Sequence, residues 1–287
     1  MTRAATCAWI HLTTRRRPLL VGEILVVLCL LRVYDYVRAH AEVRAAAAMQ
    51  HGRALLELEQ VLRIDVERTL NHWAERHDLV TLLASHWYQF VHIPVTLSVL
   101  AWVWLRHPGH YRRVRTALVL INVVGLAVFL LLPVAPPRLL PGGGFLDSVA
   151  LAGFGSGHGG PLAADQYGAM PSLHLAWAVW SALVARRILR RPFWRLAWLG
   201  YPIMTTVAVV LTANHYLLDA VVGAGVALLA LRLRPTLVTD LRAPGAGAAA
   251  EVGTAAGPDR AAEPDSAAKP ERAAEPEGAP ALVRTRP

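Results

Sequence analysis

Apolar blocks of about twenty residues recur along this chain, separated by short arginine clusters and by loops rich in glycine and proline. A helix of about 20 apolar residues is long enough to cross the hydrocarbon core of a bilayer. The chain is 55% hydrophobic, and its mean hydropathy is +0.38. Because the apolar residues gather in blocks, the sequence predicts an all-α, polytopic membrane protein rather than a soluble core.

Six transmembrane helices are expected, at residues 18–36, 82–105, 114–132, 170–184, 196–212 and 214–231. The first is expected to be an uncleaved anchor. Residues 39–41 match a signal-peptide cleavage site, but charged Arg32, Asp35 and Arg38 separate the apolar run from that site. Between the first two spans, residues 41–78 repeat leucine at spacings of three and four among charged residues. This pattern predicts one or two interfacial amphipathic helices.

The chain is therefore expected to have three parts: a cytoplasmic N-terminus at residues 1–17, a six-helix membrane domain at residues 18–234, and a tail at residues 235–287. The tail is rich in Ala, Pro, Glu and Gly, and it repeats the letters AAEP. Such a composition cannot bury enough apolar surface to fold, so the tail is expected to be disordered.

The arginine distribution predicts which ends of the helices face outward. Two crossings separate spans four and six, so both begin on the same face, and the loop at residues 133–169 leaves span three on that face. Arginine clusters lie on the opposite face, at residues 15–17, 106–115, 186–195 and 232–234. Residues 38–76 add six arginines to the first face, but these are mixed with acids. Since cytoplasmic loops carry the excess of arginine, we expect a multi-pass protein of the cell membrane with an extracytoplasmic site.

The net charge of +9 then reflects membrane orientation, and no nucleic-acid partner is expected. The bilayer itself is the expected partner.

Reactive side chains stand at the start of spans four and six, where polar groups are costly and usually functional. The i,i+4 spacing puts Asp219 on the same helix face as His215. There a carboxylate can bind one imidazole nitrogen and leave the other more basic, which activates a nucleophile. His174 comes from another helix and has no carboxylate at that spacing, so it is free to donate and accept protons.

A phosphate suits the residues beside this group. Pro171 suits the first position of a helix, and Ser172 offers a hydroxyl and an N–H where the helix dipole favours an anion. Arg138 lies in a loop otherwise poor in arginine, and its planar guanidinium can bind a phosphate through two hydrogen bonds. We therefore predict that Arg138 and Ser172 bind phosphate.

Each of these residues also has a structural interpretation. A single histidine near the end of a membrane helix is usually interfacial, and His86, His92 and His158 receive that interpretation. Asp219 alone could be a buried structural acid, and Arg138 alone could contact lipid headgroups. The two histidines with the aspartate could also bind a metal. No further strong ligand is apparent at a suitable spacing, so neither a metal nor a cofactor is expected.

At these residues the sequence resembles the type-2 phosphatidic acid phosphatase superfamily, whose second motif is Pro-Ser-x-His and whose third ends in His-x-x-x-Asp. Residues 171–174 and 215–219 match these two motifs. The letters APPR, GAMPSLHLAW and TANHYLLD resemble the branch that includes inositol phosphorylceramide synthases, which are inositolphosphotransferases, and bacterial relatives. The resemblance implies that His215 becomes phosphorylated, that Asp219 orients it, and that His174 protonates the leaving group.

The resemblance extends over about residues 53–231 and departs from the superfamily at two places. The third motif usually opens with Ser-Arg, but Ala208 and Val209 stand there. The first motif, a Lys followed later by Arg-Pro, is replaced by APPR at residues 135–138. Two phosphate-binding cations of the superfamily are therefore missing, and only Arg138 is carried over.

Together these features predict an integral membrane phosphatase or phosphotransferase that acts on a lipid phosphate or pyrophosphate. The phosphoryl group would pass through a phosphohistidine to water or to an alcohol acceptor. One alternative is headgroup transfer of the inositol phosphorylceramide synthase type. Another is a carrier or scaffold in which these residues relay protons or bind an anion. The origin of the two histidines on separate helices favours in-line displacement over a relay.

Overall fold

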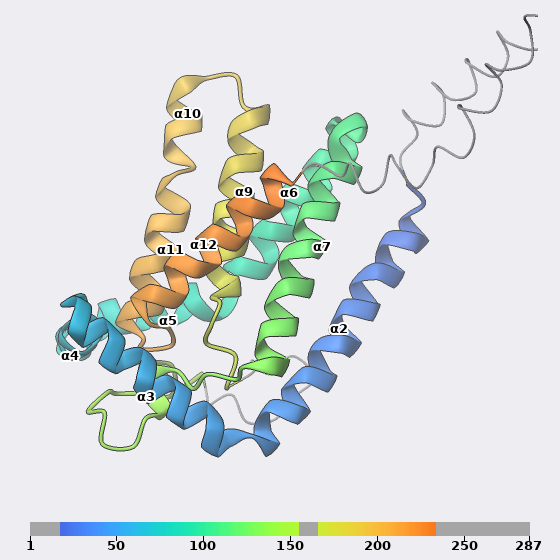
Figure 1. The fold of residues 1–287 in the computed structure, drawn as a ribbon. Coiled ribbons are helices and arrows are strands. Elements are labelled where there is room, and N and C mark those ends of the chain that lie inside the picture. Colours follow the sequence, from blue (N-terminus) through green and yellow to red (C-terminus); the bar gives the residue numbers. More distant parts are fainter. Residues whose placement is uncertain (1–17, 155–165, 234–287) are drawn as a thin grey trace, which may run out of the picture. The chain divides into compact units, whose positions relative to one another are not determined.

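The computed structural model describes residues 18–154 and 166–233, which fold into helices and connecting loops (Figure 1). The predicted N-terminus at 1–17, the predicted tail at 235–287 and His158 lie outside the described residues. The α-helices of the described part are α2 (Leu20–Val43), α3 (Ala45–Leu62), α4 (Glu67–Glu75), α5 (Asp78–Phe90), α6 (His92–Arg106), α7 (Pro108–Leu131), α8 (Ser148–Leu151), α9 (Leu173–Ile188), α10 (Pro192–Ala197), α11 (Gly200–Leu211) and α12 (Leu217–Arg232). A 3-10 helix, η1 (Pro137–Leu139), follows α7, and the only strand-like pairing among the described residues is an isolated bridge between Val134 and Gly168. The predicted all-α class is confirmed for this part of the chain.

Two helical stretches are long and apolar enough to cross a membrane. They are Pro108–Leu131, with a mean hydropathy of 2.3, and Pro192–Leu211, with a mean hydropathy of 1.3. Helices α5 and α6 form a third candidate if the pair, bent by 46° at its break, is a single span. These apolar helices indicate a membrane protein, and they correspond to three of the six predicted crossings.

The other three predicted crossings are helices that do not meet the length and composition of a membrane span, for different reasons. Helix α2 has 24 residues, but its apolar run is interrupted by Glu23, Arg32, Asp35 and Arg38. Helices α9 and α12 have 16 residues each. At 1.5 Å per residue each covers about 24 Å, less than the roughly 30 Å of a bilayer core. The residues immediately before α9 and α12 are not helical, and they carry the candidate site.

Helix α9 packs against α6, α7, α10, α11 and α12, and so joins most of the apolar core. Trp180 of α9 is completely buried together with Val103 of α6, Ile121 of α7 and Ala227 of α12. Close packing of this kind fixes the helices relative to one another. The starts of α9 and α12 are therefore held on a rigid support.

Helices α3 and α4 form the stretch predicted to be amphipathic, and the face that they bury carries both apolar and polar side chains. Glu59, Glu67 and Asn71 are completely buried, while Leu58 and Leu70 are 47% and 38% exposed. The helical pattern is confirmed, but the leucines divide: Leu55 and Leu56 are buried, whereas Leu58 and Leu70 point away from the protein interior. The interfacial position on the membrane stays a prediction, and exposed leucines suit it.

Candidate active site

Helix α9 begins at Leu173, and the residue before it caps the helix. Ser172 is the N-cap residue, and its Oγ accepts a hydrogen bond from the N–H of Leu175 at 3.4 Å. A serine at this position satisfies an amide that a helix start leaves unpaired. The prediction that Pro171 is the first helical residue is wrong, because it precedes the cap. His174 lies in the first turn of α9.

Ser172 also ties the start of α9 to α12. Its N–H donates to the carbonyl oxygen of Asp219 at 3.0 Å, and the residue is completely buried. Gly223 permits this close approach, because a Cβ at that position would lie 2.2 Å from the carbonyl oxygen of Ser172. The observed role of Ser172 is to fix the two helix starts together, and its contact with phosphate stays a prediction.

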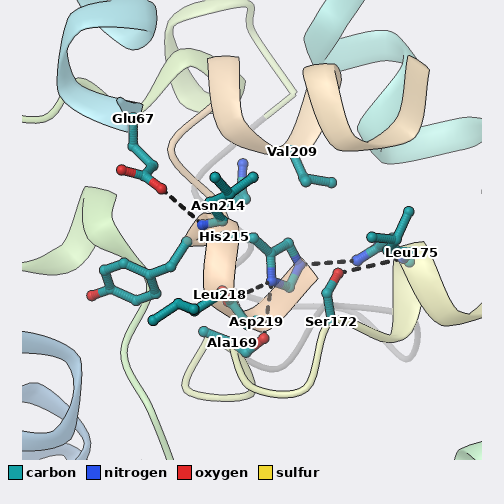
Figure 2. A network of polar contacts seen from close by, with 12 residues as sticks. Glu67, Ala169, Ser172, Leu175, Val209, Asn214, His215, Leu218 and Asp219 are labelled. Atoms are coloured by element: carbon teal, nitrogen blue, oxygen red, sulfur yellow. Dashed lines mark hydrogen bonds and ion pairs between the residues drawn. The ribbon is translucent and has the colours of Figure 1, made fainter. Parts of the chain in front are cut away.

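His215 lies in the turn before α12, and its Nδ1 faces two hydrogen-bond acceptors. Asp219 Oδ2 is 3.0 Å away, and the carbonyl oxygen of Ala169 is 2.9 Å away (Figure 2). Since neither an ionised carboxylate nor a carbonyl can donate, Nδ1 carries the hydrogen, and a neutral ring keeps its lone pair on Nε2. His215 is 3% exposed and Asp219 is completely buried. The lone pair of Nε2 is therefore left on the side of the ring away from Asp219.

His174 approaches this nitrogen from α9. Its Nδ1 lies 3.2 Å from Nε2 of His215, and the ring of Tyr88 packs against it with a centroid distance of 4.6 Å. An imidazole in this position can exchange a proton with a group bound at Nε2. The structure thus brings together the three residues predicted to be catalytic, His174, His215 and Asp219.

Arg138 lies in η1 and is held next to this group by two side chains. Its Nε donates to Asn214 Oδ1 at 2.7 Å, and its Nη1 forms an ion pair with Asp147 Oδ2 at 2.8 Å. Its backbone N–H donates to the carbonyl oxygen of Ala213 at 3.0 Å. A guanidinium has five N–H donors, so these contacts leave donors for an anion. Asn214 directly precedes His215 in the chain, and the sequence analysis missed its role.

A sequence model of the PAP2 superfamily matches residues 53–233. The chain belongs to the PAP2 superfamily. The matched range begins inside α3 and ends just after α12, so it contains every residue of the site described above. Searches of curated proteins and of solved structures each gave no match. PAP2 membership supports a function of the phosphatase or phosphotransferase type and an enzyme of the phosphoric-ester hydrolase kind.

Val209 occupies the place where the motif comparison with the PAP2 superfamily expects an arginine. Its side chain is completely buried beside Tyr88, and its carbonyl oxygen accepts from the N–H groups of Asn214 and His215 at 3.1 and 3.3 Å. This position therefore holds the turn before α12. Val209 brings no positive charge to this turn, whereas the guanidinium of Arg138 is held beside it through Asn214.

His92 is also part of the surroundings of the PAP2 site, so the interpretation of this residue as interfacial is wrong. Its side chain is 3% exposed, its ring centroid lies 4.8 Å from that of His174, and the hydroxyl of Tyr201 lies 3.3 Å from its Nδ1. The sequence did carry a signal for this role, because an ionisable residue inside an apolar membrane segment is usually functional.

In residues 18–154 and 166–233, no group of three or more His, Cys, Asp or Glu side chains is arranged to hold a metal ion.

Gly223→Ala should reduce activity by displacing the start of α9 from α12. The added Cβ would meet the backbone oxygen of Ser172 at 2.2 Å, so the helices have to move apart. A displacement of about 1 Å can cost on the order of a hundredfold in rate, and we expect kcat/KM on nitrophenyl phosphate to fall at least about tenfold. Gly225→Ala is the matched control, because its Cβ would meet nothing within 4 Å. Equal activity of the two variants would contradict a positioning role for this contact.

Proposed function

We propose that this PAP2 protein is an integral membrane phosphatase or phosphotransferase that cleaves a lipid phosphate or pyrophosphate through a phosphohistidine on His215. The observation that carries the proposal is the pair of acceptors, Asp219 and the Ala169 carbonyl, at Nδ1 of His215. They keep the hydrogen on Nδ1, so Nε2 is available to attack phosphorus. Membership of the PAP2 superfamily supports the same chemistry.

In the first step, Nε2 of His215 forms a bond to phosphorus while the bond from phosphorus to the leaving oxygen breaks. A protonated His174 gives its proton to that oxygen, which leaves as an alcohol or, from a pyrophosphate, as a phosphate. Asp219 stabilises the positive charge that develops on the ring of His215. The contact of 3.2 Å between the two histidines has to open to admit the phosphoryl group.

In the second step, water or an alcohol attacks the phosphorus, and the phosphorus–nitrogen bond breaks. His174 accepts the proton of the attacking oxygen, which restores its protonated form. Attack by water releases phosphate and makes the protein a phosphatase. Attack by an alcohol makes it a phosphotransferase. In the alternative of the inositol phosphorylceramide synthase type, the phosphorus would keep its headgroup and pass to the alcohol together with it.

Apolar side chains on the helices around the site support a lipid as the substrate. On α11, which leads into the turn that carries His215, Ile203 is 62% exposed, Met204 is 49% exposed and Val207 is 44% exposed. Such a surface suits acyl chains of the bilayer. A lipid substrate could keep its chains in the membrane while its phosphate enters the site.

Activity on a panel of substrates tests the proposed function. Purified protein should release phosphate from a lipid phosphate or a lipid pyrophosphate, or form a new phosphate monoester when an alcohol acceptor is supplied. The two products distinguish hydrolysis from transfer. Absence of turnover on every lipid phosphate, with or without acceptors, would favour the carrier or scaffold interpretation.

Arg138→Lys should lower kcat/KM about ten- to a hundredfold, equivalent to about 1.4 to 2.7 kcal/mol. Lysine keeps the charge but loses the planar fork, so it cannot contact Asn214, Asp147 and a phosphate together. The assay is kcat/KM on the best substrate of the panel. Arg53→Lys is the control, because Arg53 is exposed on α3. Near-normal activity of Arg138→Ala would remove this residue from the site.

We also propose that the chain crosses the membrane six times and that the site faces the extracytoplasmic side. In a background with Cys7 and Cys29 replaced by serine, Leu146→Cys should react with an impermeant thiol reagent in intact cells. Arg190→Cys should not react until the cells are opened. Leu146 and Arg190 are both exposed, so access to the reagent depends on the membrane. The reverse labelling pattern would place the site on the cytoplasmic side.

A further inference from the structure

Two carboxyl groups from α3 and α4 meet the first turn of α12. Oε1 of Glu67 accepts a hydrogen bond from the N–H of Leu217 at 2.7 Å, and Oε1 of Glu59 accepts from the N–H of Leu218, also at 2.7 Å. Figure 2 shows Glu67 reaching the start of this helix. Both amides belong to residues 215–219, the stretch that joins the proposed nucleophile to its carboxylate. The two acids therefore hold the backbone that sets the distance between these groups.

Helix α12 has no cap of its own. Its N-cap residue is Tyr216, whose side chain makes no capping hydrogen bond, because the hydroxyl donates to the carbonyl oxygen of Ala135 at 3.0 Å. Amides at a buried helix start need acceptors from elsewhere. Helix α3 comes close because of Gly52, where a Cβ would lie 2.6 Å from the same carbonyl oxygen. Acids that lie 150 and 159 positions earlier in the chain thus supply the cap.

Each of these carboxyl groups has one oxygen left over. Glu59 and Glu67 are completely buried, their binding to adjacent amides of α12 places them side by side, and Oε2 of each lacks a protein donor in the part of the chain that the structure describes. Two buried carboxylates cannot both stay charged at such a distance. Burial, with the neighbouring Glu67, raises the pKa of Glu59 from 4.5 to about 8. A proton on one carboxyl can then be donated to the other, which gives both leftover oxygens a partner.

We propose that Glu59 and Glu67 share one proton and act together as positioning residues that hold His215 and Asp219 in their reactive geometry. The inference rests on the proposed function of His215. The pair keeps one negative charge, which the N-terminal end of α12 favours. The titratable groups that face the pair are Asp219 and Tyr216 on the side of α12. Loss of the shared proton would add a second negative charge here, and the two carboxylates would repel each other.

Glutamine variants test the shared proton, because an amide mimics a protonated carboxyl group. Glu59→Gln or Glu67→Gln alone leaves one donor and one acceptor between the two side chains, so each should keep kcat within about threefold of wild type. In the double variant, two –NH2 groups face each other, so the contact between the two side chains has donors but no acceptor. Its kcat should fall at least about tenfold, while KM changes less than about twofold. The control double variant, Glu57→Gln with Asp65→Asn, removes two exposed acids and should match wild type.

Thermal unfolding of the same variants needs no substrate, so it separates this inference from the proposed function. The folded protein holds the proton of Glu59 up to about pH 8, whereas the unfolded chain releases it near pH 4.5. Stability falls with rising pH wherever the folded state binds more protons than the unfolded state. The contribution of Glu59 to the unfolding temperature of the wild type should therefore fall between about pH 4.5 and pH 8. Glu59→Gln cannot lose this proton and should reduce the fall.

Two results would overturn the inference. If the double glutamine variant kept the kcat of the single variants, no proton would join the two side chains. If each single variant lost as much as the double variant, the charges rather than a shared proton would be required. If the wild type cleaved no phosphate ester but its unfolding temperature depended on pH as expected, the shared proton would be supported. The positioning role would then be excluded.

Discussion

Replacing His215 with alanine should abolish phosphoryl transfer, and Asp219→Asn should reduce turnover by orders of magnitude. The alanine variant has no nucleophile to form the covalent intermediate. Asparagine fits the space of Asp219 but lacks the charge that stabilises the developing imidazolium ring. The equivalent change in a serine protease triad costs about ten-thousandfold. Because the Ala169 carbonyl remains at Nδ1, 2.9 Å away, we expect a loss in kcat of about a thousand- to ten-thousandfold.

The decisive measurement is a base quench during turnover of a labelled substrate. Wild type should carry acid-labile, base-stable phosphate, and His215→Ala should carry none. His86→Ala is the matched control, since His86 is exposed on α5 and packs against Phe90 and Phe154 rather than against the site. If wild type shows no such phosphate and His215→Ala still hydrolyses an activated substrate, the phosphohistidine mechanism is wrong. That result would favour the carrier or scaffold interpretation.

The main contacts of the site could be predicted from sequence because simple geometry decides them. The spacing of four residues predicts Asp219 beside His215, and the contact forms even though His215 lies in the turn before α12 rather than within the helix. The two crossings predicted between spans four and six put His174 at the same end of the bundle as His215. These arguments need only the helical period and the order of the apolar blocks. They do not need the backbone of the loops.

The residues that were missed depend on loop backbone and on partners distant in sequence. Asn214 reaches Arg138 because the turn before it places Ala213 in the left-handed region, with a φ of 51°. Such a conformation is uncommon for a residue other than glycine, so no sequence pattern signals it. The Ala169 carbonyl at Nδ1 of His215 is likewise a backbone contact. No side-chain motif can encode it.

The amphipathic stretch shows why burial could not be predicted even where the helices could. A leucine pattern with charged neighbours usually means leucines inside and charges outside. Here Glu59 and Glu67 are buried, because the start of α12 presents amides that need acceptors. That need arises only once the chain has folded. Span six was predicted to begin at residue 214, but α12 begins at Leu217, because the residues before it form a turn held by the carbonyl oxygen of Val209.

His174→Ala should lose activity according to how poor the leaving group is. Nδ1 of His174 lies 3.2 Å from Nε2 of His215, so its ring is close to any oxygen that leaves phosphorus at that atom. General acid catalysis contributes about a hundred- to ten-thousandfold when the leaving group needs a proton. We expect a loss of that size in kcat for a lipid phosphate whose alkoxide leaves. For nitrophenyl phosphate, whose leaving group needs no proton, the loss should stay below about tenfold.

The ratio of kcat for the two substrates is the informative quantity, because damage to the fold lowers both values and leaves their ratio unchanged. Misplacement of the nucleophile would slow both substrates alike, as expected for Gly223→Ala, whereas loss of the acid should slow only the alkoxide. His86→Ala should leave both rates and their ratio unchanged. Equal losses for the two substrates in His174→Ala would mean that this residue holds the ring of His215 without donating the proton. The proton would then have to come from another group near the leaving oxygen, and His92, whose ring lies 4.8 Å from that of His174, would be the first residue to replace.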